Sequence, residues 1–241
     1  MAHAKRPKAL LFDVFGTVVD WRGSIAREAQ KLLAPKGHDR DWDAFARDWR
    51  GRYQPAMERI RSGERGFVRL DILHRENLVE TLDAFDITGL DEAEIDHLNH
   101  AWHRLDPWPD APSGLARLKR EAIIATLSNG NIALMVNMAR NGGLPWDVIL
   151  GAEVARAYKP QPEAYLRSCE ALSLGPGETM LVAAHNSDLV AAAATGMRTA
   201  FVLRAEEYGD PAHEDAKARG SYDVIADDFH DLADKLGIPR P

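Results

Sequence analysis

The stretch "ALLFDVFGTVVDWR", residues 9–22, contains an apolar run that ends at a single carboxylate, Asp13, and continues through Gly16 and Thr17. An apolar run of about four to eight residues followed by a turn signal is typical of a fully buried strand. A carboxylate inside such a strand is costly unless it is paired. At the carboxyl end of a parallel strand, however, a carboxylate faces the crevice where open α/β sheets bind ligands. The stretch therefore predicts that Asp13 is a reactive group.

The composition is that of a globular protein with a sizeable core, because 45% of the 241 residues are hydrophobic and 28% are charged. The formal net charge of -7 disfavours nucleic acid or an anionic membrane as a partner. No apolar stretch approaches the roughly 20 residues of a membrane span, and the start "MAHAKRPK" shows no signal-peptide pattern. The one cysteine, Cys169, excludes internal disulfides, and its helix-like surroundings favour a buried core position. We therefore expect a cytoplasmic protein.

Residues 24–104 contain almost no strand-like runs, and their apolar residues recur at three- and four-residue intervals. This periodicity predicts amphipathic helices over 24–37, 43–60, 67–85 and 91–105. Three prolines in "DPWPDAP", residues 106–112, end this helical block.

Beyond the prolines, helical segments alternate with apolar runs that predict strands, which are "EAIIATLSNG", "DVILG", "TMLVAAH" and "RTAFVL". The segments "YDVIAD" and "FHDLADKLG" finish the chain. This alternation predicts a parallel sheet with helices on both faces. Because one strand precedes the helical block and the others follow it, the block is an insertion. The sequence predicts an α/β core domain of residues 1–17 and 109–241 and a helical domain of residues 18–108.

Polar residues follow four of the predicted strands, and a parallel sheet would bring them to one crevice. They are Asp13, Gly16 and Thr17; Ser128, Asn129 and Gly130; Lys159; and His185, Asn186 and Asp188. Each has a structural alternative, since Ser128 and Asp188 could cap helices and Lys159 could be a solvated loop charge. The occurrence of one polar set per strand favours a shared active site.

The motifs "FDVFGTVVD", "LSNG", "YKPQP" and "HNSD" resemble the four motifs of the haloacid dehalogenase superfamily, over nearly the whole chain. Within it, the chain looks most like the hydrolytic L-2-haloacid dehalogenases, the type II haloacid dehalogenases. The resemblance implies a Rossmann-like parallel-sheet core with an inserted helical cap, and it implies that Asp13 is the nucleophile.

Two positions favour a dehalogenase over the phosphatases that make up most of this superfamily. The phosphatases carry a general-acid aspartate two residues after the nucleophile, where this chain has Phe15. They also carry a metal-binding aspartate where the alignment on Asp188 puts Ala184. A halide leaves unprotonated and needs no acid, whereas phosphoryl transfer needs Mg²⁺ and its oxygen ligands. The pattern therefore implies a metal-independent enzyme with no cofactor.

The segment "RDWRGRYQPAM" resembles the place where the dehalogenases carry a halide-binding arginine after a tryptophan, which Trp49 and Arg50 match. Arg50 could instead lie on a solvated helix face, because Arg47 and Arg52 are close in sequence. An apolar wall that excludes bulk water could come from Trp42, Trp49, Tyr53 and Phe67. The chain departs from the family at His185, which stands where an asparagine is usual, and at Ser187, which stands where an aromatic residue is usual.

The resemblance implies covalent catalysis in which Asp13 displaces halide from a short 2-haloalkanoate and water then hydrolyses the ester. The implied catalytic residues are Asp13, Thr17, Arg50, Lys159, His185, Asn186 and Asp188, with His185 or Asn186 helping Asp188 to orient water. Val14, Phe15, Ser128 and Asn129 are the implied substrate-binding residues. At His185 we hypothesise a narrow site that favours haloacetates and can cleave C–F bonds; a neutral histidine that only orders Asp188 or the water is the alternative.

The implied partners are a small anionic haloacid and the halide product, and a homodimer stays open beside a monomer. Two other functions also stay open. One is a small-molecule phosphatase or phosphonatase of the same superfamily, and the other is a non-catalytic binding protein. The Asp13–Lys159 pair argues against a binding protein, because binding alone needs no nucleophile.

Overall fold

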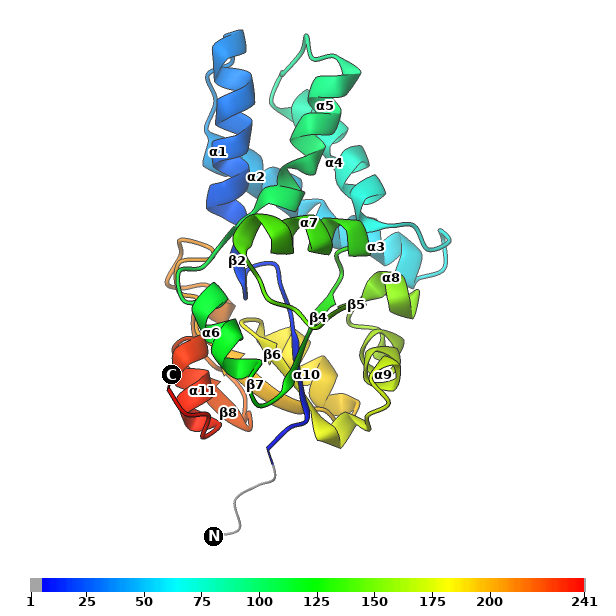
Figure 1. Ribbon diagram of the computed structural model, residues 1–241. Helices are drawn as coiled ribbons and strands as arrows, with labels where there is room; N and C mark the ends of the chain where they lie inside the picture. The colour runs from blue at the N-terminus through cyan, green and yellow to red at the C-terminus, as the bar shows by residue number, and fades with distance from the viewer. Residues whose placement is uncertain (1–5, 241) are drawn as a thin grey trace.

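A six-stranded parallel sheet lies at the centre of the protein in the computed structural model, which describes residues 6–240 (Figure 1). The strand order is β5-β4-β1-β6-β7-β8. The strands are β1 (Ala9–Phe12), β4 (Ile123–Ser128), β5 (Val148–Gly151), β6 (Thr179–Ala183), β7 (Arg198–Val202) and β8 (Val224–Ala226). The predicted α/β class is confirmed. The expected lack of a signal peptide concerns a segment that begins outside the described residues.

Helices cover both faces of this sheet. Successive side chains of a strand point to opposite sides, so β1 contributes to an apolar cluster on each face. Leu10 and Phe12 of β1 pack in one apolar cluster with α6 (Ala111–Leu118), α7 (Ile132–Gly142) and α11 (Phe229–Lys235). Leu11 packs in the other cluster with α9 (Pro162–Ala171) and α10 (Asn186–Ala194). Cys169 is buried in this second cluster, as its sequence context predicts. The remaining short helices of this part are α8 (Ala152–Ala155), η3 (Pro176–Glu178) and η4 (Glu214–Ala216).

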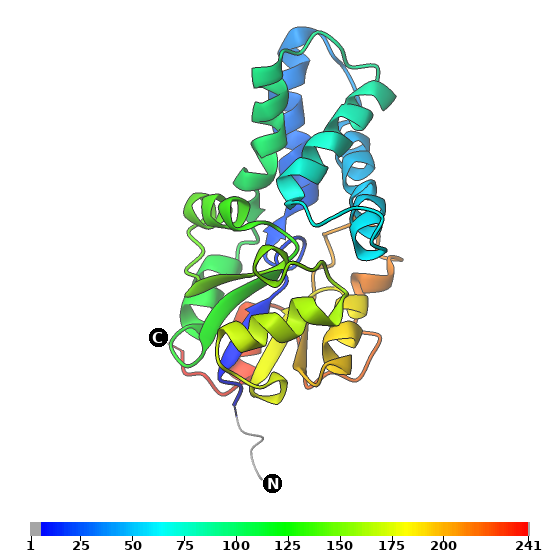
Figure 2. The ribbon, with the colours of Figure 1, turned by 90° about the vertical axis from the view of Figure 1, so that its right-hand side faces the viewer.

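A block of helices stands above the carboxyl-terminal edge of the sheet (Figures 1 and 2). It comprises α1 (Trp21–Leu33), η1 (Ala34–Lys36), α2 (Trp42–Gly51), α3 (Tyr53–Arg61), α4 (Leu70–Ala84), α5 (Glu92–Asn99) and η2 (His100–Arg104). The chain enters and leaves it through an antiparallel ribbon of β2 (Val19–Asp20) and β3 (Asp106–Pro107). We propose that this ribbon separates a core from a cap, close to the division predicted at residues 18 and 108. Among the described helices, none is long and apolar enough to cross a membrane.

Local sequence explains where α1 begins and why α2 and α3 are separate helices. The helix expected from residue 24 begins at Trp21, because the Asp20 side chain accepts a hydrogen bond from the Gly23 amide at 2.9 Å. The helix expected over 43–60 is two helices, α2 and α3. Pro55 lies in the first turn of α3 and has no N–H to continue the hydrogen bonding of α2. This break places the Arg50 guanidinium 4.0 Å from the centre of the Tyr53 ring.

Hydrogen bonds between side chains attach the cap to the core beside the predicted site. Asn131, which directly follows the "LSNG" motif, donates its Nδ2–H to Asp71 Oδ2 of α4 at 2.8 Å. His103 Nε2 lies 3.0 Å from the other oxygen of the same carboxylate. Because a carboxylate only accepts, His103 donates this bond from Nε2. The cap is therefore held to the core loop that carries Ser128 and Asn129.

Candidate active site

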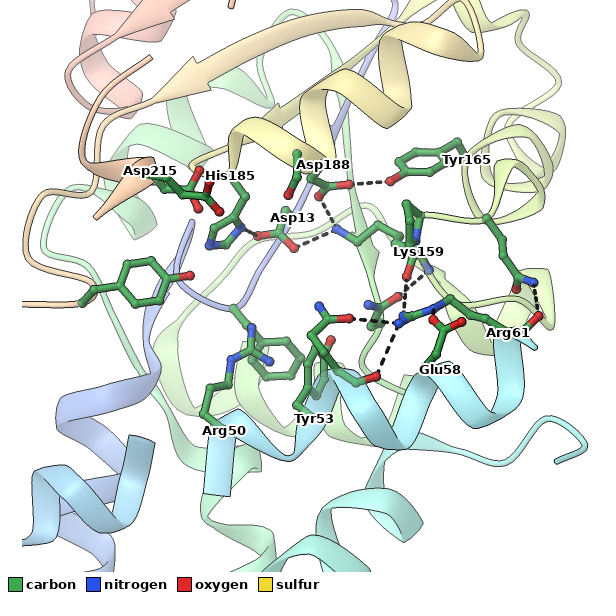
Figure 3. A pocket seen from close by; sticks show the side chains of 18 of the residues that line it. Asp13, Arg50, Tyr53, Glu58, Arg61, Lys159, Tyr165, His185, Asp188 and Asp215 are labelled. Atoms are coloured by element: carbon green, nitrogen blue, oxygen red, sulfur yellow. Dashed lines mark hydrogen bonds and ion pairs between the residues drawn. The ribbon is translucent and has the colours of Figure 1, made fainter. Parts of the chain in front are cut away.

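The ends of three adjacent strands open into one cavity. Asp13 follows β1, Asn129 follows β4 and His185 follows β6, and β1 pairs with both of the other strands. A cavity of about 810 Å³ lies between these residues and cap helix α3 (Figure 3). Among its lining residues are Asp13, Phe15, Arg50, Tyr53, Arg61, Asn129, Lys159, Tyr165, His185, Asp188 and Tyr208. The convergence expected at the strand ends therefore includes a wall contributed by the cap.

Asp13 is held as an ionised carboxylate by three side chains. Oδ1 accepts from Lys159 Nζ at 2.8 Å, and Oδ2 accepts from the Thr17 hydroxyl at 2.8 Å. His185 Nδ1 lies 3.1 Å from the same Oδ2. Burial alone would raise the pKa of the Asp13 carboxyl, but the Lys159 charge and then the His185 contact hold this pKa well below its usual range. The arrangement can present an anionic oxygen to the cavity at any ordinary pH.

Lys159 lies between two carboxylates. Its Nζ is 2.8 Å from Asp13 Oδ1 and 2.5 Å from Asp188 Oδ2, and the lysine side chain is 9% exposed. Burial alone would lower the pKa of Lys159, yet the charges of Asp13 and Asp188 raise it above its usual value. Tyr165 donates its hydroxyl to the other oxygen of Asp188 at 2.6 Å. Lys159 is therefore a fixed cation, and Asp188 acts on Asp13 through it.

His185 connects Asp13 to a second buried carboxylate, Glu207. His185 Nε2 lies 3.0 Å from Glu207 Oε1 and 3.1 Å from Oε2, and Glu207 is 1% exposed. Both ring nitrogens thus face carboxylates, which only accept hydrogen bonds, so both carry a proton. Burial alone would lower the pKa of His185, but Glu207 and Asp13 together raise it well above its usual value. His185 is an imidazolium between two anions.

Glu207 reaches this position because Gly16 makes room for it. Gly16 has φ +85°, and a Cβ built there would lie 2.0 Å from Glu207 Oε1. The same oxygen accepts from the Trp21 indole N–H at 3.0 Å. The first-motif glycine is therefore more than a turn residue, since any side chain there would displace Glu207 from His185.

Arg50 forms the cap wall opposite Asp13 (Figure 3). Its guanidinium carbon lies 4.0 Å from the Tyr53 ring centre, 5.8 Å from that of Phe15 and 5.6 Å from that of Trp21. Its Nη1 is buried and has no hydrogen-bond partner among residues 6–240. A cation that packs on aromatic rings and keeps one buried nitrogen without a partner is suited to a small anion. The alternative of a solvated helix face does not describe this side chain.

The other predicted site residues fall into two groups. Phe15 and Asn129 line the cavity, and Asn129 Oδ1 accepts from the Lys159 amide at 2.9 Å. Thr17, Ser128 and Val14 are fully buried below the lining. Thr17 contacts Asp13 and accepts from the Ala184 amide at 2.9 Å, and Ser128 Oγ accepts from the Gly130 amide at 3.0 Å.

Asn186 does not join this group. Its Nδ2 donates to Asp215 Oδ1 at 2.9 Å, and its Oδ1 accepts from the Tyr222 hydroxyl at 2.8 Å. These bonds hold the loop that follows β7, and Asn186 is not among the residues that line the cavity. Of the two residues expected to help Asp188 orient water, the geometry therefore favours His185.

The expected apolar wall is only partly present. Tyr53 lines the cavity, whereas Trp49 is buried inside the cap, where its indole N–H donates to the His74 carbonyl at 2.9 Å. Phe67 stacks on Tyr158 with ring centres 5.2 Å apart, and Trp42 packs on Phe45. Neither Phe67 nor Trp42 is among the lining residues. The structure adds Phe15, Tyr165 and Tyr208 to the aromatic lining.

The carboxylates around Asp13 do not fit a magnesium site. Asp13 Oδ1 and Asp188 Oδ2 both bind the Lys159 ammonium, and the position of the phosphatases' metal-binding aspartate holds Ala184, which is 1% exposed. Mg²⁺ requires a near-octahedral shell of oxygen ligands. Phe15, in place of the general-acid aspartate, has no proton to transfer.

The comparisons with known proteins agree with this geometry. A solved structure of a defluorinating L-2-haloacid dehalogenase is 52% identical, with a TM-score of 0.94, and the match covers 96% of this chain and 95% of that one. The (S)-2-haloacid dehalogenase of Xanthobacter autotrophicus is 29% identical over 202 residues, 82% of this chain and 75% of the relative. A phosphoglycolate phosphatase of Pseudomonas aeruginosa is 25% identical over 231 residues, 94% of this chain and 78% of the relative.

The family model for haloacid dehalogenase-like hydrolases matches residues 7–196, which include all four motifs and the cap. The resemblance inferred from those motifs is confirmed: this chain belongs to the haloacid dehalogenase-like hydrolase family.

Proposed function

We propose that the protein is a hydrolytic dehalogenase that converts short 2-haloalkanoates, such as haloacetates and 2-halopropionates, to 2-hydroxy acids. One observation carries this proposal: the ionised Asp13–Lys159 pair lines the same cavity as Arg50, whose buried Nη1 has no hydrogen-bond partner among residues 6–240. Displacement at carbon requires a nucleophile and a place for the departing anion, and it requires no general acid because a halide leaves unprotonated. The similarity to L-2-haloacid dehalogenases supports the same reaction.

In the first step, a carboxylate oxygen of Asp13 bonds to C2 while the carbon–halogen bond breaks and its electron pair leaves with the halide. Lys159 keeps Asp13 ionised and oriented. Arg50 and Asn129 receive the halide as charge builds on it. The substrate carboxylate is assigned to the backbone amides of Val14 and Phe15 in the first loop. Ser128, which ends β4 and is buried below the lining, supports the neighbouring loop through the Gly130 amide.

In the second step, water adds to Cγ of Asp13, the ester C–O bond breaks, and the 2-hydroxy acid leaves. His185 is the side chain in position to take the proton of this water, because its Nδ1 faces Asp13 and its Nε2 is fixed by Glu207. Thr17 remains bonded to the Asp13 oxygen during this step. Asp188 holds Lys159 in place.

Formation of the ester gives His185 its role as a base at the right time. In the free enzyme His185 carries two protons, since it lies between Asp13 and Glu207. Esterification removes the negative charge of Asp13, so the pKa of His185 falls. The Nδ1 proton is then released to solvent, and it is the one proton that the net reaction produces together with the halide. Neutral His185 then accepts a proton from water and returns it to the departing alkoxide. Asp13, formed as the free acid, reprotonates His185.

We further propose activity on fluoroacetate. Fluoride is the smallest and most basic halide, so its departure depends most on close donors, and Arg50 offers a buried one. A relative of similar structure is a defluorinating dehalogenase. A cytoplasmic location is also part of the proposal, supported by the single buried cysteine. A homodimer stays a prediction, and sedimentation velocity tests it by measuring the oligomeric state of the protein in solution.

The experiment is halide release from fluoro-, chloro- and bromoacetate and from both enantiomers of 2-chloropropionate, with and without EDTA. The proposal expects release that chelation does not change. The competing function is a phosphatase of the same family, since a phosphoglycolate phosphatase is also similar. Activity that stops in EDTA and returns with Mg²⁺, or phosphate release without halide release, would favour that function.

A further inference from the structure

Arg61, the last residue of cap helix α3, reaches across to the main chain of Lys159 in the core (Figure 3). Its Nη1 donates to the Lys159 carbonyl oxygen at 3.1 Å, and its side chain is only 12% exposed. The contact is to the backbone of Lys159, so it can act on the Lys159 ammonium without touching the reacting atoms.

The sequence around Lys159 explains why its carbonyl needs a donor from elsewhere. The loop reads "YKPQP", and Pro160 and Pro162 have no N–H to donate. A buried carbonyl without a donor is costly. Among residues 6–240, Arg61 is the donor that the structure gives to this oxygen.

Core and cap hold the two ends of the same residue. The Lys159 amide donates to Asn129 Oδ1 of the core at 2.9 Å, while its carbonyl accepts from Arg61 of the cap. In return, Gln161 Nε2 donates to the Arg61 carbonyl at 3.3 Å. The position from which the Lys159 side chain extends toward Asp13 therefore depends on a cap residue.

The guanidinium of Arg61 is itself fixed and is not free for a substrate anion. Its Nε donates to Glu58 Oε2 at 2.8 Å, and its Nη2 donates to the Gln54 side-chain oxygen at 3.2 Å and to the Gln54 carbonyl at 3.3 Å. Every guanidinium nitrogen thus has a partner. This distinguishes Arg61 from Arg50, whose Nη1 has none among residues 6–240.

We propose that Arg61 is a positioning residue that sets the main chain of Lys159 and, through the Lys159 ammonium, the ionisation and orientation of Asp13. The cap thereby contributes to the nucleophile itself, in addition to forming a wall of the cavity. The inference rests on the proposed dehalogenase function.

The test compares Arg61→Met and Arg61→Lys with Arg59→Met, a matched control on the same helix. The Arg59 side chain pairs with the exposed Glu64. Arg61→Met is expected to lower kcat on chloroacetate roughly 10–100-fold with KM within about twofold, because misplaced groups slow the chemistry more than binding. In the pH profile of kcat, the acid limb of Arg61→Met is expected to lie at higher pH than that of the wild type, because Lys159 stabilises the Asp13 carboxylate less in this variant. Arg61→Lys should lie between Arg61→Met and the wild type, and Arg59→Met should equal the wild type.

A second readout does not need dehalogenase activity. Carboxyl ¹³C NMR, with Asp13→Asn to assign the signal, should show a higher pKa of Asp13 in Arg61→Lys than in the wild type. The proposal is overturned if KM rises while kcat stays, since Arg61 would then bind substrate. It is also overturned if Arg61→Met matches Arg59→Met, or if folded Arg61→Lys keeps both the wild-type kcat and the wild-type pKa of Asp13. Failure of the wild type to release halide would overturn the proposed function, while the NMR result would still decide the role of Arg61.

Discussion

Nε2 of His185 lies 3.0 Å from Oε1 of Glu207, and the two residues come from loops that follow different strands, β6 and β7. The same imidazole faces Asp13 on its other side. Tyr208 also lies near this imidazole, with its ring centre 6.4 Å away, and it lines the cavity with Asp215. Glu207 is buried, and an anionic neighbour favours the cationic form of an imidazole. Glu207 therefore controls when His185 can act as a base.

We expect Glu207→Gln to slow hydrolysis of the ester more than its formation. Loss of the Glu207 charge lowers the pKa of His185, so the rise of the hydrolysis rate with pH shifts to lower pH. The maximal hydrolysis rate also falls, since a weaker base is less effective. We expect the rate of ester hydrolysis to fall roughly 10²-fold, which is at the lower end of general-base effects. Rapid-quench measurements should show a burst of halide stoichiometric with enzyme, followed by slow turnover.

Glu206→Gln is the control for that substitution, because Glu206 is the exposed neighbour of Glu207. It should keep wild-type kinetics. Slower halide release with unchanged ester hydrolysis in Glu207→Gln would show that Glu207 serves the first step instead.

Asp13→Asn should abolish turnover and leave the fold intact, because the side chains are nearly isosteric and an amide is a poor nucleophile. The substitution also has a pH signature. Folding lowers the pKa of Asp13, so its ionisation stabilises the native state above the unfolded-state pKa, and this contribution is lost as the pH falls through the folded-state value. The difference in free energy of unfolding between wild type and Asp13→Asn should therefore be larger at neutral pH than in acid, as chemical denaturation at several pH values can measure. A constant difference would mean that folding does not lower the pKa of Asp13.

Arg50→Ala should lower kcat on the order of 10²–10³, the loss expected when a donor to a developing anion is removed. Stopped-flow halide release measures this step. Arg52→Ala is the control, because Arg52 pairs with Asp48 and Glu80 and does not line the cavity. An Arg50→Ala variant with near wild-type kcat would contradict the assignment of this arginine to the halide.

His185→Asn, which restores the residue usual in the family, tests the fluoride hypothesis. If the imidazolium assists the departure of fluoride, the rate on fluoroacetate should fall at least about tenfold more than the rate on chloroacetate, since fluoride is the more basic leaving group. Single-turnover halide release from both substrates, with enzyme in excess, a fluoride electrode and a chloride assay, gives this ratio without the ester-hydrolysis step that both substrates share. An equal fall in both rates would show that His185 has no role specific to fluoride.

The α/β sheet, the inserted helices and the convergence of Asp13, Lys159, Asp188 and His185 could be predicted because they depend on local pattern. Apolar periodicity distinguishes strands from helices, and a parallel sheet brings the strand ends together. The motif order then identifies which residues meet. Adjacency in sequence also predicts that Asn186 joins them, but its side chain faces the loop after β7 instead.

Glu207 and Arg61 could not be predicted, because their roles depend on contacts between distant segments. Glu207 lies in a loop without a motif, and it reaches His185 only because Gly16 and Trp21, near the other end of the chain, form its site. Arg61 is one of several arginines in the cap, and its role depends on a main-chain carbonyl 98 positions away in sequence. Pro160 and Pro162, which follow Lys159 closely, are the feature of the sequence that indicates that this carbonyl needs a donor.

The most direct test of the central claim, attack by Asp13 on carbon, is a single turnover of chloroacetate in H₂¹⁸O with enzyme in excess. In the covalent scheme the hydroxyl oxygen of the product comes from Asp13, so mass spectrometry should find unlabelled glycolate and one ¹⁸O in the peptide that contains Asp13. Glycolate that carries ¹⁸O after the first turnover, with no label in Asp13, would show that water attacks carbon directly and would contradict the account.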